Sequence, residues 1–295
     1  MSQTKLRTYP DVSLPVGTRP KLQPLRLLTV LIIVVVVVDF AVGVVRNDRL
    51  AWDVVAEYIF SPDIISGLGV TLWLTVVSMV LGTALGGVLA VMALSNDPIL
   101  RGVAALYVLV FRSVPQLVQL LFWYFLAAIV PFISIGLPFG IDIVTLDSTK
   151  LITQMAAALL GLSLAEAAYL AEYFRAGITS VPTGQTEAAM ACGMTPNKKF
   201  WRIVVPQAIR IVIPSYGNSF ISLLKGTSIV FVIGAGELLT RAQLIYSQNY
   251  QQIPLLIVVS IWYVFLVVLM TLVQRRIEAR YSRGYSALTT TTASQ

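Results

Sequence analysis

Ionisable side chains lie inside long apolar runs of this sequence, where a charge is costly and usually serves a function. Glu166 falls in the run Leu151–Arg175. Tyr169 and Tyr173 follow it at i+3 and i+7, so they lie on the same face of a helix as the carboxylate. This face is suited to bind the ammonium group and side chain of an amino acid. Alternatively, Glu166 forms a buried ion pair with Lys225, which interrupts a later run.

A second polar group surrounds Arg112, the one charged residue in the apolar run Gly102–Pro131. Pro115 frees a backbone carbonyl, which a membrane helix tolerates where it lines a cavity. Gln116 and Gln119 follow Arg112 by one and two helical turns. Together with these amides, the guanidinium could receive a carboxylate, which it matches bidentately. The alternative is that Arg112 snorkels toward the cytoplasm.

The third polar interruption is the stretch Lys225-Gly226-Thr227-Ser228. It lies in the apolar run Ile211–Ala235. A glycine followed by two hydroxyls indicates either a locally unwound segment that presents backbone groups to a ligand or close helix packing through small residues. Asn218, one helical face away, has the same two interpretations. Gly82 and Gly86 form a G-x-x-x-G pattern that indicates another close-packing face.

Composition places the chain among membrane proteins. Of its 295 residues, 57% are hydrophobic and only 12% are charged, whereas soluble domains carry about 25% charged residues. The sequence has no histidine, which excludes histidine-based catalysis and metal ligation, and its single cysteine excludes an internal disulfide. It also has no G-x-x-x-x-G-K-[ST] loop. If the chain takes part in uphill transport, the nucleotide chemistry therefore lies on another chain.

Six apolar runs are long enough to span a bilayer as helices of about 20 residues. They are Leu27–Val45, Ile64–Ser95, Gly102–Pro131, Leu151–Arg175, Ile211–Ala235 and Pro254–Val273. They predict an all-α, polytopic membrane protein. The first run is predicted to remain as an uncleaved helix, because it is about as long as a span and no A-x-A cleavage site follows it.

The distribution of Lys and Arg predicts how the chain is oriented in the membrane. With the N-terminus inside, fifteen of the 21 basic residues fall on the cytoplasmic side, four fall outside and two lie within spans. Both termini are therefore predicted to be cytoplasmic, and the net charge of +7 reflects topology, not a nucleic-acid partner. Glu172 and Arg175, three residues apart near the cytoplasmic end of the fourth run, predict a local ion pair.

This orientation places the stretch Thr186–Ala208, "TEAAMACGMTPNKKFWRIVVPQA", in the cytoplasm. Thr183 or Thr186 can cap a helix there, and the alanines that follow propagate it. Gly193 can end the helix in left-handed geometry, and Pro196 blocks its continuation. A short helix of this kind serves either as a docking element or as an interfacial helix lying on the lipid headgroups.

The residues of this stretch carry a family resemblance. The pattern consists of Glu187-Ala188-Ala189, three residues, Gly193, nine residues, Ile203, one residue and Val205-Pro206. It resembles the EAA loop of permease subunits of ABC importers, with Val205 where that family usually has Leu. The flanking stretches resemble the polar-amino-acid branch: Phe111–Tyr124, Ala165–Ala189 and Pro206–Ser228. The resemblance covers Ile64 to Arg283, so the helix over Leu27–Val45 is additional.

The resemblance implies a type I importer permease with a five-helix core and one extra N-terminal helix, in the bacterial plasma (inner) membrane. The implied organisation is a cytoplasmic tail over 1–26, the extra helix over 27–45, an external loop over 46–63, the permease core over 64–275 and a cytoplasmic tail over 276–295 whose end is disordered. Within the core, 176–206 is the cytoplasmic coupling loop. The chain itself is not an enzyme and needs no cofactor or metal.

The implied partners are a second permease copy or a sister permease, two ATP-binding subunits that hold ATP and magnesium, membrane lipid, and an extracytoplasmic binding protein that delivers a polar amino acid. Docking to the ATPase would use the matching positions Glu187, Ala188, Ala189, Gly193 and Pro206. The substrate side chain stays open. An acidic substrate favours contacts with Arg112 and Lys225, and a basic one favours Glu166.

Overall fold

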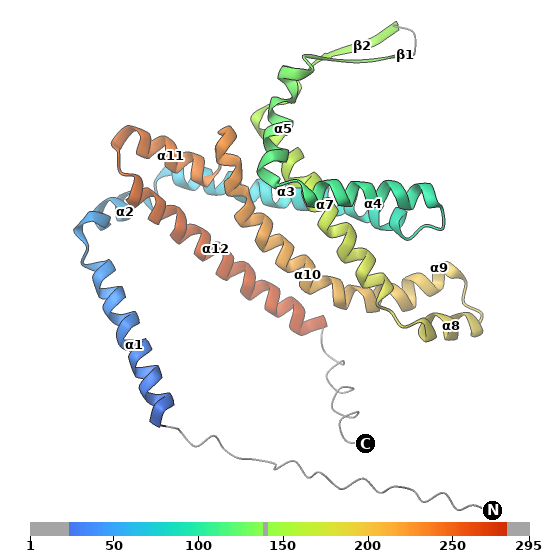
Figure 1. Cartoon of the computed structure of the whole chain (residues 1–295), viewed down its shortest axis with the longest axis horizontal. Helices are drawn as coiled ribbons and strands as arrows, with labels where there is room; N and C mark the ends of the chain where they lie inside the picture. Colours follow the sequence, from blue (N-terminus) through green and yellow to red (C-terminus); the bar gives the residue numbers. More distant parts are fainter. Residues whose placement is uncertain (1–23, 138–140, 282–295) are drawn as a thin grey trace, which may run out of the picture. The chain divides into compact units, whose positions relative to one another are not determined.

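The computed structural model describes residues 24–137 and 141–281. The predicted tails over 1–26 and 276–295 lie largely outside these residues. The chain divides into two compact units, Met1–Ala51 and Trp52–Gln295, which we describe separately. Helices dominate the described part of both (Figure 1), as the predicted all-α membrane fold requires.

The first unit consists of helix α1 (Pro24–Val45) and a short 3₁₀ helix, η1 (Asp48–Leu50). With 22 residues, α1 is about 33 Å long, enough to cross the hydrocarbon core of a bilayer. Its side chains are exposed along nearly the whole length within this unit. A helix that is apolar on every face is stable only in lipid or against other membrane helices.

The second unit contains the remaining helices long and apolar enough to span a membrane. They are α3 (Pro62–Ala93), α7 (Gln154–Thr179), α10 (Val205–Gly226) with its 3₁₀ continuation η3 (Thr227–Ile233), and α12 (Gln252–Tyr281). Two shorter helices, α4 (Pro98–Ser113) and α5 (Gln116–Ile129), meet at a bend of 103°. With α1, the described residues therefore hold five candidate spans, or six if the bent pair counts as one.

The predicted span over Gly102–Pro131 is broken at Pro115, so two helices stand where one was predicted. Proline has no N–H to donate to the carbonyl four residues earlier. The side chain of Gln119 supplies a substitute, since its Nε2 donates to the carbonyl oxygens of Phe111 at 2.9 Å and Val114 at 2.8 Å. The buried amide therefore stabilises the break between α4 and α5.

Helices α3 and α7 form the centre of the unit and pack closely against each other (Figure 1). A Cβ atom added at Gly86 would lie 2.9 Å from the carbonyl oxygen of Ala167, and one at Gly82 would lie 3.1 Å from the Cβ of Glu166. The facing side of α7 is rich in buried alanines. The predicted close-packing role of the G-x-x-x-G pattern is thus confirmed, because only small residues allow this approach.

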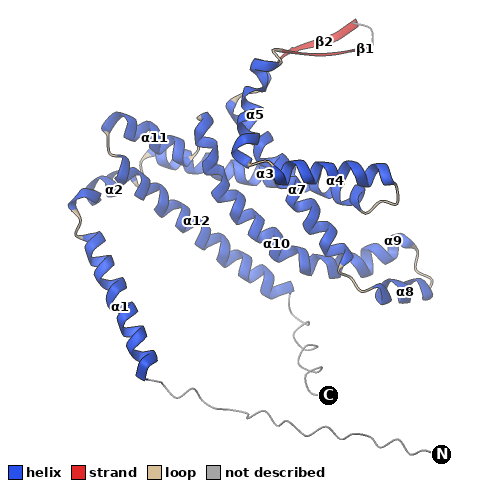
Figure 2. Cartoon of the chain, in the orientation of Figure 1, coloured by secondary structure: helices blue, strands red, loops and turns tan. Residues whose placement is uncertain are grey.

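A β-hairpin that the sequence analysis did not predict connects the α5 and α7 regions (Figure 2). Strands β1 (Phe132–Leu137) and β2 (Ile141–Asp147) pair antiparallel, with Phe132 opposite Asp147, and a one-turn helix, α6 (Ser148–Leu151), follows. The sequence nevertheless contains the pattern that predicts such a hairpin. A proline and a glycine separate two short stretches rich in β-branched residues, which is typical of a hairpin.

The remaining elements of the second unit lie at the ends of the long helices. They are α2 (Trp52–Tyr58), α8 (Thr183–Ala191), α9 (Pro196–Lys199), η2 (Phe200–Val204) and α11 (Leu238–Asn249). The N-cap of α11 is Glu237, whose fully buried carboxylate accepts bonds from the backbone of Leu239 and Thr240. Burial raises the pKa of this carboxyl group, and the hydrogen bonds from Thr240 and Leu239 oppose that shift.

Candidate functional site

A polar cavity of about 340 Å³ lies between α7 and α10, with one residue contributed by α5. Its lining consists of Gln116, Ala165, Glu166, Tyr169, Tyr173, Asn218, Ser219, Ser222 and Leu223. Four of the predicted pathway residues, Gln116, Glu166, Tyr169 and Asn218, therefore line one space. The cavity holds a single carboxylate, several hydroxyls and two amides, which suits a small polar solute.

Glu166 is the charged group of this cavity, and only 7% of its surface is exposed. Its Oε1 accepts a hydrogen bond from the hydroxyl of Ser219 on α10. The predicted alternative, an ion pair with Lys225, is wrong, because the structure pairs Glu166 with Ser219 and leaves Lys225 exposed. The predicted common face of Glu166, Tyr169 and Tyr173 is confirmed, since all three line the cavity.

Ser219 and Ser222 are lining residues that the sequence analysis missed. They lie three residues apart, and therefore on one face of α10. Serine occurs throughout membrane helices, so a single hydroxyl is a weak signal. The pair becomes informative only together with Asn218 and the position of Glu166 on the neighbouring helix.

The stretch Lys225 to Ser228 is the point where α10 ends and the tighter 3₁₀ helix η3 begins, so the chain here is neither unwound nor continuous α-helix. Thr227 is buried and donates to the carbonyl oxygen of Leu224 at 2.7 Å, while Ser228 donates to that of Lys225 at 2.7 Å. Both hydroxyls thus satisfy local backbone groups. Neither they nor Lys225 line the Glu166 cavity, and Gln119 does not line it either.

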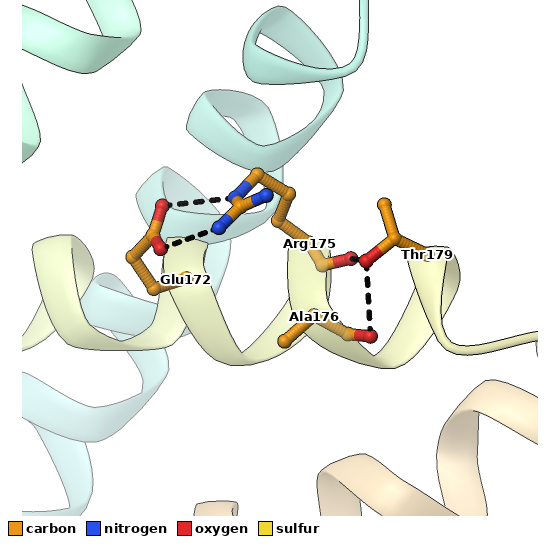
Figure 3. A network of polar contacts seen from close by, with 4 residues as sticks. All are labelled: Glu172, Arg175, Ala176 and Thr179. Carbon is orange, nitrogen blue, oxygen red and sulfur yellow. Dashed lines mark hydrogen bonds and ion pairs between the residues drawn. The ribbon is translucent and has the colours of Figure 1, made fainter.

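Arg112 lies beside the Glu166 cavity, on the other side of Tyr169. Its Cζ atom is 5.3 Å from the centre of the Tyr169 ring, which is a cation–π distance. Two residues of α7 form the predicted local ion pair nearby, with Arg175 Nη2 at 2.9 Å from Glu172 Oε2 (Figure 3). Thr179 continues this polar edge of α7 by donating to the carbonyl oxygen of Arg175 at 3.0 Å.

The second candidate site is α8, which contains the EAA residues. The expectation that Thr183 or Thr186 caps it is wrong: the N-cap is Pro182, and the hydroxyl of Thr186 donates to the carbonyl oxygen of Thr183 instead. Proline already fixes the backbone at the start of this helix, so no capping side chain is needed to direct the chain.

The C-terminal end of α8 follows the prediction. Gly193 has φ 72°, in the left-handed region. Its N–H donates to the carbonyl oxygen of Met190 at 2.9 Å, and the N–H of Met194 donates to that of Ala189 at 3.0 Å. These two bonds form a Schellman motif, which ends the helix firmly. Pro196 then begins the short helix α9.

The surface of α8 is available for a partner. Glu187, Ala188 and Gly193 are exposed, and Met190 exposes 54% of its surface, whereas Ala189 is buried against the chain. Pro206 lies in the first turn of α10, after α9 and η2. The segment that contains α8, α9 and η2 connects α7 to α10, so α8 lies in the connection between the two helices that line the Glu166 cavity.

The fold and the two sites define a polytopic membrane permease. Residues 82–283 match the family model described as binding-protein-dependent transport system inner membrane component. The match spans more than half of the chain, and the chain belongs to this family. It is therefore a multi-pass inner-membrane protein and a transport subunit.

Curated relatives carry similar descriptions. An arginine transport system permease protein of Corynebacterium glutamicum is 37% identical over 271 residues, which cover 92% of this chain and 84% of the relative. An L-cystine transport system permease protein of Bacillus subtilis is 36% identical over 236 residues, 79% of this chain and 92% of the relative.

A solved structure described as an amino acid ABC transporter with histidines is 33% identical and covers 75% of this chain and 95% of its own, with a TM-score of 0.64. The MetNI methionine ABC transporter has the same fold, with a TM-score of 0.60 at 23% identity, over 75% of this chain and 97% of its own. The chain thus has the fold of an ABC importer permease and resembles amino-acid permeases of that class.

Proposed function

We propose that the chain translocates a polar amino acid, delivered by an extracytoplasmic binding protein, and that ATP hydrolysis on partner subunits drives it through α8. One observation carries the proposal: α8 has an exposed EAA surface and lies in the segment that connects α7 to α10, the helices that line the Glu166 cavity. Relatives named for arginine and cystine transport support an amino-acid substrate.

The cavity provides complementary contacts for such a solute. The Glu166 carboxylate can accept hydrogen bonds from an ammonium group, a charge-assisted contact that is stronger than a neutral one. Gln116 and Asn218 offer amides, and Tyr169 and Tyr173 offer both hydroxyls and ring faces. Arg112 stands beyond Tyr169, where a carboxylate that leaves the cavity would meet a guanidinium. Lys225, Thr227 and Ser228 lie outside the cavity and are secondary candidates for contact with the solute along its pathway. Gln119 would contribute indirectly, by stabilising the bend between α4 and α5.

Coupling would work by moving α8 as a rigid body. The alanines permit close backbone approach to a partner, and the exposed carboxylate of Glu187 can pair with a basic group across the interface. Gly193 ends the helix in a Schellman motif, which fixes its C-terminus. A displacement of α8 would be transmitted to α7 and α10, and the cavity between them would open alternately to each side of the membrane.

The proposed assembly contains a second permease copy or a sister permease, two ATP-binding subunits with ATP and magnesium, and the binding protein. This chain would hold no cofactor. Both termini and α8 would be cytoplasmic, because fifteen of the 21 basic residues then fall inside. Domain boundaries would follow the resemblance, with the transport core over 64–275 and α1 as an addition to it.

The proposal is tested by reconstitution with the ATP-binding subunits and the binding protein. Glu187→Lys should abolish substrate-stimulated ATP hydrolysis while the complex still assembles. Glu278→Lys, the same charge reversal near the C-terminal end of α12, is the matched control and should stay coupled. Normal coupling in the Glu187 variant would refute the role of α8. Transport by the chain alone, without ATP, would refute the proposed function as a whole.

A further inference from the structure

A second cavity, of about 640 Å³, lies between α4 and α7 on the other side of Tyr169. Three guanidinium groups line it, those of Arg101, Arg112 and Arg175, together with one carboxylate, that of Glu172. Its charge balance is therefore opposite to that of the Glu166 cavity. The transport proposal uses only Arg112 of this group, as a point that a departing carboxylate would meet.

Within the cavity the charges are not balanced. Glu172 is already engaged by Arg175, whose Nε and Nη2 donate to its two oxygens at 3.1 and 2.9 Å (Figure 3). Arg101 and Arg112 form no ion pair among the residues that the structure describes. Arg112 lies over the Tyr169 ring and within electrostatic reach of Glu172, so Arg101 is the guanidinium most available for an anion. Phosphate is the anion whose geometry matches the guanidinium fork best, together with carboxylate.

Between Arg101 and Arg112, the wall of the cavity is apolar. The α4 residues that line it follow a helical repeat from Arg101 to Arg112, and those between them are small or aliphatic: Ala104, Ala105, Val108 and Leu109. Eleven helical steps separate the Cα atoms of the two arginines by about 16 Å. An apolar wall that begins at a cationic group complements an amphiphile better than a wholly polar solute.

The cavity lies where a membrane helix meets the headgroup region. Arg101 is in the first turn of α4, and Arg175 is in the last turns of α7, just before the loop that contains α8. In the proposed orientation both ends are cytoplasmic. Basic pockets between membrane helices on this side are a known setting for anionic lipid headgroups.

We propose that the cavity between α4 and α7 binds an anionic phospholipid. Arg101 holds the phosphate at the cytoplasmic end of the wall, an acyl chain lies along Ala104 to Leu109, and Arg112 at the far end adds to the positive potential of the cavity. A zwitterionic amino acid fits less well, because its ammonium group would have to compete with Arg175 for the one carboxylate. The inference goes beyond the proposed transport function and requires only that these helices lie in a bilayer.

The test is native mass spectrometry of the full-length chain, purified in mild detergent with any subunits that remain attached. Phosphatidylglycerol and phosphatidylethanolamine are added in equal amounts, and the bound fraction of each is measured. The wild-type chain should retain phosphatidylglycerol preferentially. Arg101→Gln with Arg112→Gln should lower this retention at least tenfold. Arg276→Gln with Arg280→Gln, the same loss of charge at the exposed end of α12, should leave it unchanged.

Two further arms keep the result interpretable. Thermal unfolding of each variant checks that it is folded, and Arg101→Lys with Arg112→Lys, which keeps both charges but loses the forks, should give intermediate retention. Equal losses in the α12 control, or no preference for the anionic lipid, would overturn the proposal. Displacement by free glycerol phosphate at equal concentration would identify a small-anion site instead and overturn the lipid. None of these outcomes bears on the coupling role of α8.

Discussion

The cavity between α7 and α10 and the cavity between α4 and α7 share one wall, the ring of Tyr169, but they hold opposite charges. The first encloses a single carboxylate, that of Glu166, which is bound to Ser219. The second is open and carries three guanidinium groups against one carboxylate. One helix thus faces two chemically different environments.

The geometry of α7 explains this difference. Steps of three residues turn a helix by about 300°, so successive side chains at this spacing shift by about 60° around the axis. From Glu166 through Tyr169 to Glu172, the side chains therefore turn from one cavity to the other, and Tyr169 falls between them. A ring at this position can separate a solute site from a lipid site without any additional element.

The largest effect should follow from removing the carboxylate of the enclosed cavity. Glu166→Gln keeps the shape but loses the charge, and a hydrogen bond to a charged group is worth about 1.5–3 kcal/mol. We expect uptake in proteoliposomes to fall by about 10- to 100-fold. Anionic-lipid retention should not change, because Glu166 does not line the second cavity.

Glu278→Gln is the matched control for this prediction, since Glu278 lines neither cavity and, among the described residues, accepts a hydrogen bond from Gln274 of its own helix at 2.7 Å. Its uptake should equal that of the wild-type chain. Equal uptake in the Glu166 and Glu278 variants would show that the enclosed carboxylate is not a substrate contact.

The next effect concerns the residue that holds Glu166 in place. Ser219→Ala removes the donor to Oε1, so the Glu166 carboxylate loses its hydrogen bond from α10. We expect uptake to fall about tenfold through a higher KM for the solute, because the loss of such a bond costs about 1.5 kcal/mol. Ser247→Ala, which removes an exposed hydroxyl on α11 that donates to the carbonyl oxygen of Leu244 at 2.9 Å, is the control. An unchanged KM for Ser219→Ala would contradict the assignment.

A smaller effect tests the shared wall itself. Tyr169→Leu removes the ring over Arg112, and a cation–π contact at an exposed site is worth about 0.5–1 kcal/mol. Both uptake and anionic-lipid retention should therefore change by about two- to fivefold. Tyr173→Leu should change uptake alone, because Tyr173 lines only the Glu166 cavity. If the Tyr169 variant altered uptake alone, the second cavity would not depend on this wall.

Much of this arrangement was predictable from the sequence, because it depends on local spacing. Apolar runs predicted the long helices, and the i+3 and i+7 spacing placed Tyr169 and Tyr173 with Glu166. Gly193 ends α8 in the left-handed geometry that its residue type indicated. In each case the information lies within one helix, where side-chain directions follow from the helical period.

What the sequence could not predict depends on contacts between distant segments. The partner of Glu166 is Ser219, 53 residues away, and a serine gives no charge signal that would select it over Lys225. The bend at Pro115 could be suspected from the proline, but its 103° angle depends on Gln119 satisfying the freed carbonyls. The second cavity combines Arg112, which the sequence indicated, with Arg101 and Arg175, and their proximity depends on the packing of α4 against α7.

The smallest effect separates the two carboxylates of α7. Glu172→Gln removes the counter-charge of Arg175, and a largely exposed pair of this kind is worth about 0.3–0.5 kcal/mol. The freed guanidinium adds to the field of Arg101 and Arg112, so phosphatidylglycerol retention should rise about twofold, as measured by native mass spectrometry against Glu278→Gln. A fall in retention would mean that Glu172 itself contacts the headgroup. The ligand would then carry an ammonium group beside its phosphate, and the cavity would select a zwitterionic lipid instead of an anionic one.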